Sequence, residues 1–540
     1  MMRTPSWRRA IAALLLASLG ASASAAAATE AAGTVLRTAV PFSVGDLDPV
    51  VAYSGFYGIA QPVTRVNLDG EVELTLAESL EQPTPNLWVL TLKPGITFQN
   101  GRPVDGQAVA AAFTRQLAER PSAADAIPGA KVEATGEREV TITTEQPQRL
   151  VPVALAVADD FGVYDVDAVA GAADTGPAIA GLGAFTAPYE VVELTDTHMT
   201  LERYAGCWEG RPPLAGVEVS VVQDVQARLA AVESGEIDIA YSMNVPEVAR
   251  ALAGGEGDVR MNLTEAAVDL VRLYLNNAEP PFDDPAVRRA VRAALDYETI
   301  ATGFLEGTQE ASHGLFPDTL PQAADDLVTD PKAAAALLDG AGWVAGPDGT
   351  RAKDGVPLEV ALLIYTERPE LGPVSLAIQD QLGDLGIGVE IIEQSYDAAM
   401  YDDLSRWDAA LYLDYSVSAT GVPDTALPSY LRTGGAFNYG RISDPQLDSL
   451  IDNLAVAPDD ATRDQLLADI QELVADHSWS CTFSKSRCAV AGVRALREAH
   501  LPHIGLAGQM RRCGGRRARA SVRIRQRAAW SGVAHVRASA

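Results

Sequence analysis

The sequence predicts an α/β protein with two lobes, and two strand–helix–strand patterns far apart in the chain carry this prediction. The first lies between residues 217 and 241, and the second between residues 358 and 392. A unit of this kind places its two strands in parallel, joined by a right-handed crossover. The chain has 540 residues, enough for two or three domains at roughly 150 residues each. We therefore expect each pattern to belong to a sheet of its own.

The N-terminus has the layout of a secretory signal peptide. Arg3, Arg8 and Arg9 precede a short apolar run at 10–19, and small residues follow from Gly20. The apolar run is shorter than the roughly 20 residues that a membrane-spanning helix needs. We expect residues 1–28 to be removed on export. Because no cysteine lies near the expected cleavage region, no lipid anchor is indicated, and the mature protein should be periplasmic.

The first half of the mature chain contains clear local signals for strands, a turn and a helix. Residues 87–92 (LWVLTL) predict a strand, and Asn100-Gly101 predicts a turn. Alanines and Phe113 then recur at helical spacing over 105–117, with Asp105 placed to cap the helix. The β-branched run at 140–144 predicts a second strand.

The charge balance disfavours several classes of partner. The formal net charge is -30 and the pI is about 4.5. Long-range repulsion of like charges opposes binding to nucleic acid and to anionic membrane surfaces. We expect a soluble monomer. Of the four cysteines, Cys481 and Cys488 are close enough in sequence for one disulfide in an oxidising compartment, and free buried thiols are the equal alternative.

Motifs for catalysis, cofactors and metals are missing from the sequence. It has no G-x-S-x-G, no H-E-x-x-H and no phosphate-binding G-x-x-x-x-G-K-[ST]. No cysteine or histidine cluster has zinc spacing. His477 lies close to Ser480, but a single histidine near a serine is usually incidental. We expect a protein without enzymatic activity, without a cofactor and without a resident metal.

Several stretches, in order along the chain, resemble the peptide/nickel-binding family of extracellular solute-binding proteins, family 5. Between residues 36 and 493 the similar segments are LAES and WVLTLKPGITF within 76–98, NGRPVD at 100–105, LNN and PPFDD within 275–284, VRRAV at 287–291, LLDGAGW at 337–343 and DPQLD at 444–448. The resemblance implies a two-lobed class II periplasmic-binding-protein fold with an extra subdomain in the first lobe. It also implies a partner, the permease of an ABC importer, to which a ligand enclosed between the lobes is delivered.

The resemblance and the local patterns together give an expected division of the chain. An Arg-rich, acid-free tail ends it, and two interpretations stay open: a basic segment for a partner, or a non-native end produced by a frameshift. The expected parts are the signal peptide 1–28, lobe I at 29–265 with its subdomain at about 62–175, lobe II at 266–484, a return segment at 485–510 and the basic tail at 511–540.

The expected ligand is a di- or oligopeptide, with two alternatives. Peptide binders of this family hold the peptide amino group with an aspartate, a role for which Asp414 and Asp424 are the candidates here. The DP pair of the family is inverted to Pro423-Asp424, a departure from the pattern. Import of a nickel chelate is the first alternative, although no histidine falls at 434–438, where such a ligand is expected. The second alternative is an exported chaperone-like protein that binds peptides without a transporter.

Aromatic side chains suit a site that must bury a small ligand between two lobes. We therefore expect aromatic residues of both lobes, with the two aspartates and a polar neighbour, to line the site. The expected residues are Tyr53, Phe56 and Tyr57 in lobe I, and Tyr412, Asp414, Tyr415, Asp424, Phe437, Asn438 and Tyr439 in lobe II.

Overall fold

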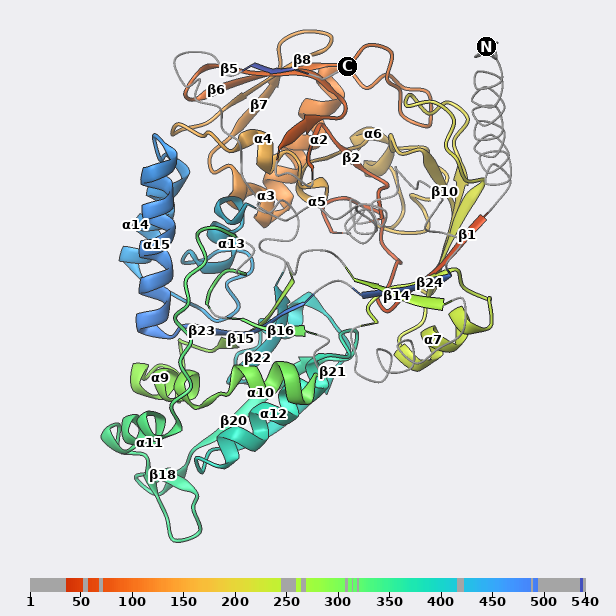
Figure 1. Ribbon diagram of the computed structural model, residues 1–540. Helices are drawn as coiled ribbons and strands as arrows, with labels where there is room; N and C mark the ends of the chain where they lie inside the picture. The colour runs from red at the N-terminus through yellow and green to blue at the C-terminus, as the bar shows by residue number, and fades with distance from the viewer. Residues whose placement is uncertain are drawn as a thin grey trace, which may run out of the picture.

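Two large β-sheets, each with its own hydrophobic core, organise the computed structural model of the chain (Figure 1). Most of the chain between Val35 and Val493 is described, and the expected signal peptide lies outside the described residues. The described residues are 35–51, 57–67, 71–243, 259–263, 269–305, 309–312, 314–317, 320–414, 422–486, 489–493 and 535–537.

The first sheet has seven strands in the order β10-β11-β12-β1-β13-β24-β14. The helix α7 (Val225–Glu233) connects β12 (Gly216–Val221) to β13 (Ile239–Ala240), as the first sequence pattern predicts. These strands run in parallel but are not neighbours, because β1 (Val35–Val40) lies between them and pairs with both. The other strands are β10 (Tyr189–Leu194), β11 (His198–Arg203), β14 (Val259–Leu263) and β24 (Ala489–Val493).

The second sheet has six strands in the order β16-β23-β15-β22-β20-β21. Here β20 (Glu359–Tyr365), α12 (Leu371–Gly383) and β21 (Gly388–Gln394) form the second predicted unit, and the two strands pair directly in parallel. On its other side, β20 pairs in parallel with β22 (Ala409–Asp414). The antiparallel strands are β15 (Asp269–Leu275), β16 (Gln309–Ala311) and β23 (Ser480–Ser486).

A smaller five-stranded sheet, in the order β25-β5-β6-β8-β7, lies with α2 beyond the first sheet (Figure 1). β6 (Leu87–Leu92) and β8 (Glu139–Thr143) confirm the two strands predicted there. In α2 (Gly106–Glu119) the Asp105 carboxylate accepts a hydrogen bond of 2.8 Å from the Ala108 N–H, which is the predicted cap. The other strands are β5 (Ala77–Thr84), β7 (Lys131–Ala134) and β25 (His535–Arg537), the described part of the basic tail.

Two adjacent strands of each large sheet connect the two sheets. β14 and β24 pair in the first sheet. β15 follows β14 in the chain, β23 precedes β24, and these two strands pair in the second sheet. The chain therefore passes between the sheets at 264–268 and at 487–488, both outside the described residues. We keep the names lobe I and lobe II for the parts built on the first and second sheets. The exact boundaries given above remain predictions.

The remaining elements complete the layers around these sheets. In the described part of the chain, no helix combines the length and the apolar character needed to cross a membrane. These elements are β2 (Gln61–Pro62), β3 (Thr64–Val66), β4 (Val72–Leu74), α3 (Pro121–Ala126), α4 (Val151–Ala154), α5 (Ala158–Phe161), β9 (Gly162–Val163), α6 (Val166–Ala170), α9 (Pro285–Ala294), α10 (Tyr297–Thr299), η1 (Ile300–Phe304), α11 (Pro331–Gly340), β17 (Val344–Ala345), β18 (Arg351–Lys353), β19 (Val356–Pro357), η2 (Ala398–Tyr401), η3 (Pro423–Thr425), α13 (Leu427–Leu431), α14 (Pro445–Ala455) and α15 (Asp460–His477).

Candidate functional site

Side chains of lobe II touch lobe I at the carboxyl end of β20. The Arg368 guanidinium lies 4.5 Å from the centre of the Phe42 ring, and it donates a hydrogen bond of 2.9 Å to the Ser242 hydroxyl. In open α/β sheets, ligands bind beyond the carboxyl ends of parallel strands. This end of β20 also faces the other lobe, so the interface between the lobes is the candidate site.

Five tyrosines of lobe II gather beside this interface and form what we call the tyrosine cluster. The rings of Tyr401 and Tyr439 stack with centroids 4.2 Å apart, and Tyr412 meets Tyr439 edge to face at 5.4 Å. Tyr401 comes from η2, Tyr412 from β22 and Tyr439 from the loop after α13, so segments far apart in sequence meet here. Such ring geometries add to the stability given by burial. The members of the cluster are Tyr274, Tyr365, Tyr401, Tyr412 and Tyr439.

The tyrosine cluster extends between two contacts that join the lobes. At one end, Tyr365 closes β20 three residues before Arg368. At the other end, the Phe437 ring lies 6.2 Å from Tyr439, and the preceding Ala436 N–H donates a hydrogen bond of 3.0 Å to Asp125 of lobe I. The cluster therefore lies between the two contacts, with its five rings buried in lobe II.

The expected residues of lobe II divide into two groups. Tyr412, Phe437 and Tyr439 are brought together in the cluster and beside it. Asn438 instead holds its own turn: its amide group donates to the Arg432 and Ile442 carbonyls and accepts from the Ile442 N–H. Tyr415 and the side chain of Asp414 lie outside what the structure describes.

Asp424 is engaged in a buried ion pair. Both of its carboxylate oxygens accept hydrogen bonds from Arg463 of α15, at 2.6 and 2.5 Å. The two side chains are 1% and 7% exposed. A carboxylate held in this bidentate way has little capacity left for a ligand ammonium group. The structure therefore argues against Asp424 as the residue that binds the ligand amino group, and it favours a structural role for Asp424.

Ion pairs dominate the corresponding part of lobe I. Arg115 of α2 donates to both oxygens of Asp48, at 3.0 and 2.7 Å, and Arg120 donates to Asp160 at 2.8 Å and to the Pro49 carbonyl. These bonds fasten the loop that leads to the expected Tyr53 and Phe56, which lie outside the described residues. The third expected aromatic residue of lobe I, Tyr57, is described and buried, 8% exposed.

Further buried charges lie where the two lobes join. Arg228 of α7 donates to the Val222, Gln223 and Ser242 carbonyls. Burial lowers the pKa of Arg228 to about 10, and the nearby Glu370 of lobe II opposes that shift. The guanidinium is thus held between carbonyls of lobe I and a carboxylate of lobe II.

Metal ligation and a disulfide find little support in the described residues. Among them, no group of three or more His, Cys, Asp or Glu side chains could hold a metal ion. The His477 ring instead stacks on Trp479 at 4.5 Å. Cys481 is a free, buried thiol whose pKa burial raises to about 11, so the structure favours the free-thiol alternative for this residue. Cys488 lies outside the described residues.

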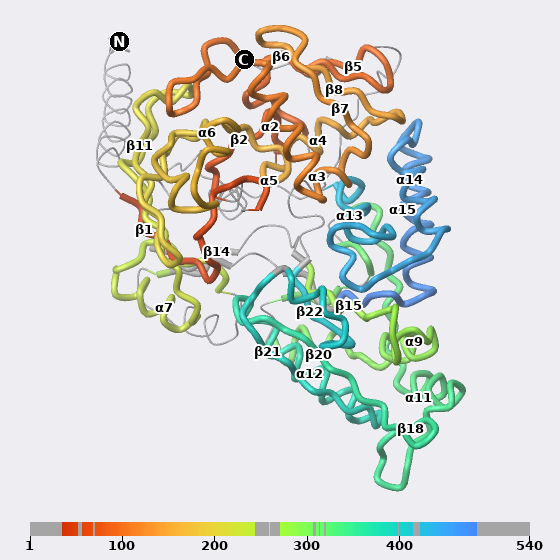
Figure 2. The backbone as a smooth tube through the Cα atoms, turned by 180° about the vertical axis from the view of Figure 1, so that it is seen from behind, coloured from red at the N-terminus to blue at the C-terminus, as the bar shows by residue number. Residues whose placement is uncertain are grey.

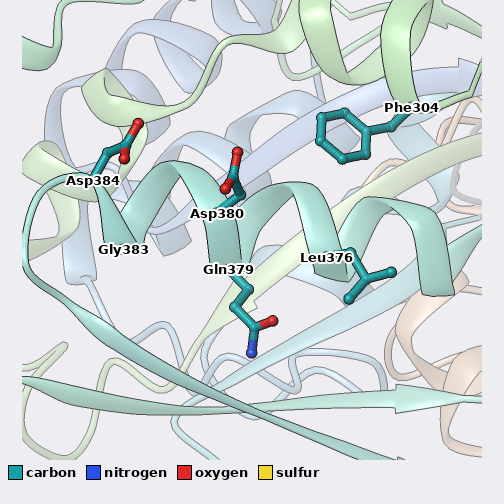
Figure 3. Close-up of a pocket in the computed structure, with 6 residues that line it drawn as sticks. All are labelled: Phe304, Leu376, Gln379, Asp380, Gly383 and Asp384. Atoms are coloured by element: carbon teal, nitrogen blue, oxygen red, sulfur yellow. The ribbon is translucent and has the colours of Figure 1, made fainter.

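A hollow on the outer face of lobe II is a separate feature (Figure 3). It has a volume of about 580 Å³ and lies along α12, where exposed residues of one helix face meet Phe304. Leu376 is 55% exposed there, so the hollow is open to solvent. A ligand site must bury most of its ligand, and this hollow lacks the enclosure to do so. Its lining residues are Phe304, Leu376, Gln379, Asp380, Gly383 and Asp384.

Sequence reasoning missed Arg368, Phe42 and Ser242. A signal for Arg368 was available, because Glu367 and Arg368 closely follow the first strand of a predicted parallel pair. The Glu367 carboxylate accepts from the Ser395 hydroxyl and the Tyr396 N–H, at 2.8 and 2.9 Å. No local pattern marks Phe42 or Ser242, because their roles depend on how the lobes meet.

Comparison with known proteins places the chain among solute-binding proteins. Residues 71–438 match the bacterial extracellular solute-binding proteins, family 5 Middle. The nickel-binding protein NikA of Staphylococcus aureus is 23% identical over 418 residues, which are 77% of this chain and 81% of that protein. The probable D,D-dipeptide-binding periplasmic protein DdpA of Escherichia coli is 25% identical over 469 residues, which are 80% of this chain and 84% of that protein.

Solved structures share the fold. The structure of Staphylococcus aureus NikA in complex with Ni(L-His)2 aligns with a TM-score of 0.76 and 21% identity, covering 85% of this chain and 95% of that one. The oligopeptide-binding protein AppA of Bacillus subtilis, in complex with a nonapeptide, aligns with a TM-score of 0.75 and 19% identity. That alignment covers 88% of this chain and 99% of AppA. The two-lobed fold is thereby confirmed.

Proposed function

The chain belongs to the bacterial extracellular solute-binding proteins of family 5, and we propose that it captures a di- or oligopeptide ligand between its lobes for an ABC importer. One observation supports the site most: the tyrosine cluster of lobe II lies between two points where lobe II touches lobe I. Binding and release follow from movement of the lobes, with no covalent chemistry. The permease in the membrane is the partner that receives the ligand.

In this proposal, each part of the interface has its own task. Tyr412, Tyr439 and Phe437 supply apolar ring surface, which binds a ligand at a low cost in conformational entropy. The Arg368 guanidinium supplies a positive charge at the junction, where it attracts a ligand carboxylate. Asp414 remains the candidate for the ligand amino group. Tyr53, Phe56 and Tyr57 are the lobe I candidates, and Tyr415 is proposed with them.

Nickel chelates are the second candidate, because the relatives include nickel-binding proteins. Among the described residues, no group of three or more His, Cys, Asp or Glu side chains could hold the metal by itself. A nickel ion would therefore enter as part of an organic chelate, with the aromatic rings and Arg368 contacting its organic part. A chaperone-like protein that works without a transporter is the alternative of another class.

Thermal unfolding tests these candidates against one another. We expect a pool of di- and tripeptides to raise the melting temperature, because a ligand at 100 times its Kd stabilises the folded state by about 2.7 kcal/mol. Nickel with excess L-histidine tests the second candidate in the same assay. Tyr412→Ala should abolish the shift, while Tyr412→Phe retains it. If neither addition shifts the parent protein, di- and tripeptides and nickel–histidine are excluded as its ligands.

The oligomeric state and the compartment of the protein follow from the same considerations. We propose a periplasmic monomer, exported by the segment 1–28 and free of a lipid anchor. The relatives named as periplasmic support the compartment. The net charge of -30 supports solubility without nucleic-acid partners. Mass determination of the exported protein would show the cleavage position and any lipid.

A further inference from the structure

The small sheet of lobe I presents one arginine rigidly toward lobe II. Arg149 follows Gln148, whose carbonyl accepts hydrogen bonds from the Trp88 indole at 2.8 Å and from the Gln82 amide at 3.1 Å. The Gln148 N–H donates to the Pro85 carbonyl. Trp88 is itself fully buried in β6. The backbone before Arg149 is therefore fixed to the sheet.

Arg149 reaches the start of α15 in lobe II. Its guanidinium donates a hydrogen bond of 2.6 Å to Asp460, the first residue of that helix, and one of 3.4 Å to the Ala457 carbonyl. The arginine side chain is 14% exposed and the aspartate side chain 49% exposed. The pair therefore joins the lobes at the edge of their interface, partly shielded from water.

A second contact joins the same small subdomain to lobe II. The Asp125 carboxylate, from α3, accepts a hydrogen bond of 3.0 Å from the Ala436 N–H. The loop that carries Ala436 is constrained by two glycines. Gly434 has a φ of +76°, and a Cβ on Gly435 would lie 2.3 Å from the Pro428 carbonyl oxygen. The loop thus holds the Ala436 N–H in place for the aspartate.

Both contacts lie on one side of the molecule. Figure 2 shows α3 beside α13, and α14 and α15 beside the small sheet. From this arrangement we propose that Arg149 and Asp125 form a two-point latch, which biases the protein without ligand toward the closed arrangement of its lobes. The latch acts from the subdomain and does not need the ligand class proposed above to be correct.

The expected strength of the latch is modest. A partly exposed ion pair contributes up to about 1 kcal/mol, and a single hydrogen bond contributes about 0.5–1.5 kcal/mol. Loss of either contact should therefore lower the ratio of closed to open protein roughly two- to tenfold. Such a change alters the average shape of the molecule in solution when the open and closed forms are comparably populated.

Small-angle X-ray scattering of the purified protein, refolded from denaturant to remove bound ligand, tests the latch. We expect Arg149→Ala, Asp460→Ala and Asp125→Ala each to increase the radius of gyration. Arg138→Ala is the matched control, because Arg138 pairs with Glu78 within the same subdomain at 2.7 Å and does not bridge the lobes. Circular dichroism confirms that every variant is folded.

A conservative variant separates the hydrogen bond from a general structural effect. Asp125→Asn keeps an oxygen that accepts from Ala436, so its scattering curve should match that of the parent protein. Curves for Arg149→Ala and Asp125→Ala that match those of the parent and of Arg138→Ala would overturn the latch. A curve for Asp125→Asn as open as that of Asp125→Ala would overturn its second point.

Discussion

The two lobes build their sides of the interface in different ways. Lobe I fastens its loop with ion pairs, chiefly Arg115 with Asp48 and Arg120 with Asp160. Lobe II packs aromatic rings, and its central pair, Tyr401 and Tyr439, is stacked at 4.2 Å. Ion pairs fix direction, whereas packed rings provide a broad apolar surface. Lobe I thus holds its loop through charged pairs, whereas lobe II builds its side of the interface from packed rings.

Removal of a ring from the tyrosine cluster should have the largest effect on stability. Tyr401→Ala should lower the free energy of unfolding by about 3–5 kcal/mol, because Tyr401 is fully buried and a cavity replaces its ring. Urea denaturation measures the change. Tyr401→Phe is the matched control. The Tyr401 hydroxyl has no hydrogen-bond partner among the described residues, so Tyr401→Phe should lower the free energy of unfolding by no more than about 1 kcal/mol. Equal losses in both variants would contradict the packing argument.

Loss of the pair between Asp424 and Arg463 should cost nearly as much. We expect Asp424→Ala to lower the free energy of unfolding by about 3 kcal/mol, since it removes the buried bidentate partner of Arg463 and leaves only the half-exposed Asp464. In the control, Asp452→Ala removes the half-exposed partner of Arg432 and should cost at most about 1 kcal/mol. An Asp424→Ala protein with parental stability but no ligand binding would restore Asp424 to the ligand site.

The ion pair of lobe I should give a smaller loss. Asp48→Ala should lower the free energy of unfolding by about 2 kcal/mol, between the values for exposed and buried pairs. The same arginine has a second, exposed partner in Glu119, so Glu119→Ala serves as the control and should change stability by less than about 0.5 kcal/mol. If both variants behave alike, the loop is not held by its ion pair.

The smallest effect concerns the buried thiol of Cys481, which lies in β23 of the second sheet. Burial raises the pKa of Cys481 to about 11, from an ordinary value near 9. The folded state therefore keeps this proton longer than the unfolded state, and its contribution to stability is lost as the pH rises from about 9 to 11. Alkylation by iodoacetamide at pH 8, mapped by mass spectrometry, should be slower at Cys481 than at the half-buried Cys207. Faster reaction at Cys481 would contradict its burial.

The sequence predicts those features that depend on local pattern. Asp105 caps α2 because a short acidic side chain precedes a helical run, and both strand–helix–strand units follow from spacing. The tyrosines at the end of β22 and after α13 were also accessible, as aromatic residues beside strand ends and turns. The order of strands in a sheet is harder to predict. The insertion of β1 between β12 and β13 pairs residues that are 181 and 201 positions apart in the chain, for example Val35 with Gly216 and Thr38 with Ile239.

Contacts between distant parts of the chain, within a lobe or between the lobes, leave no mark in the sequence. Arg149, Arg368 and Asp424 are ordinary charged residues locally, and only the assembled fold gives each its partner. Asp424 shows the consequence for site prediction: a plausible ligand carboxylate is committed to Arg463, which lies 39 residues away in the chain. Partners of this kind are fixed by tertiary packing, so spacing alone cannot assign the role.

Native mass spectrometry of the protein, purified directly from the periplasm of its host, tests the central claim most directly. The account predicts a bound small mass that is lost on mild unfolding, and the value of that mass separates a peptide from a nickel chelate. Tyr412→Ala, purified in parallel, should carry much less of it. A protein that is empty, and that neither peptides nor nickel–histidine stabilise, would contradict capture of these ligands between the lobes.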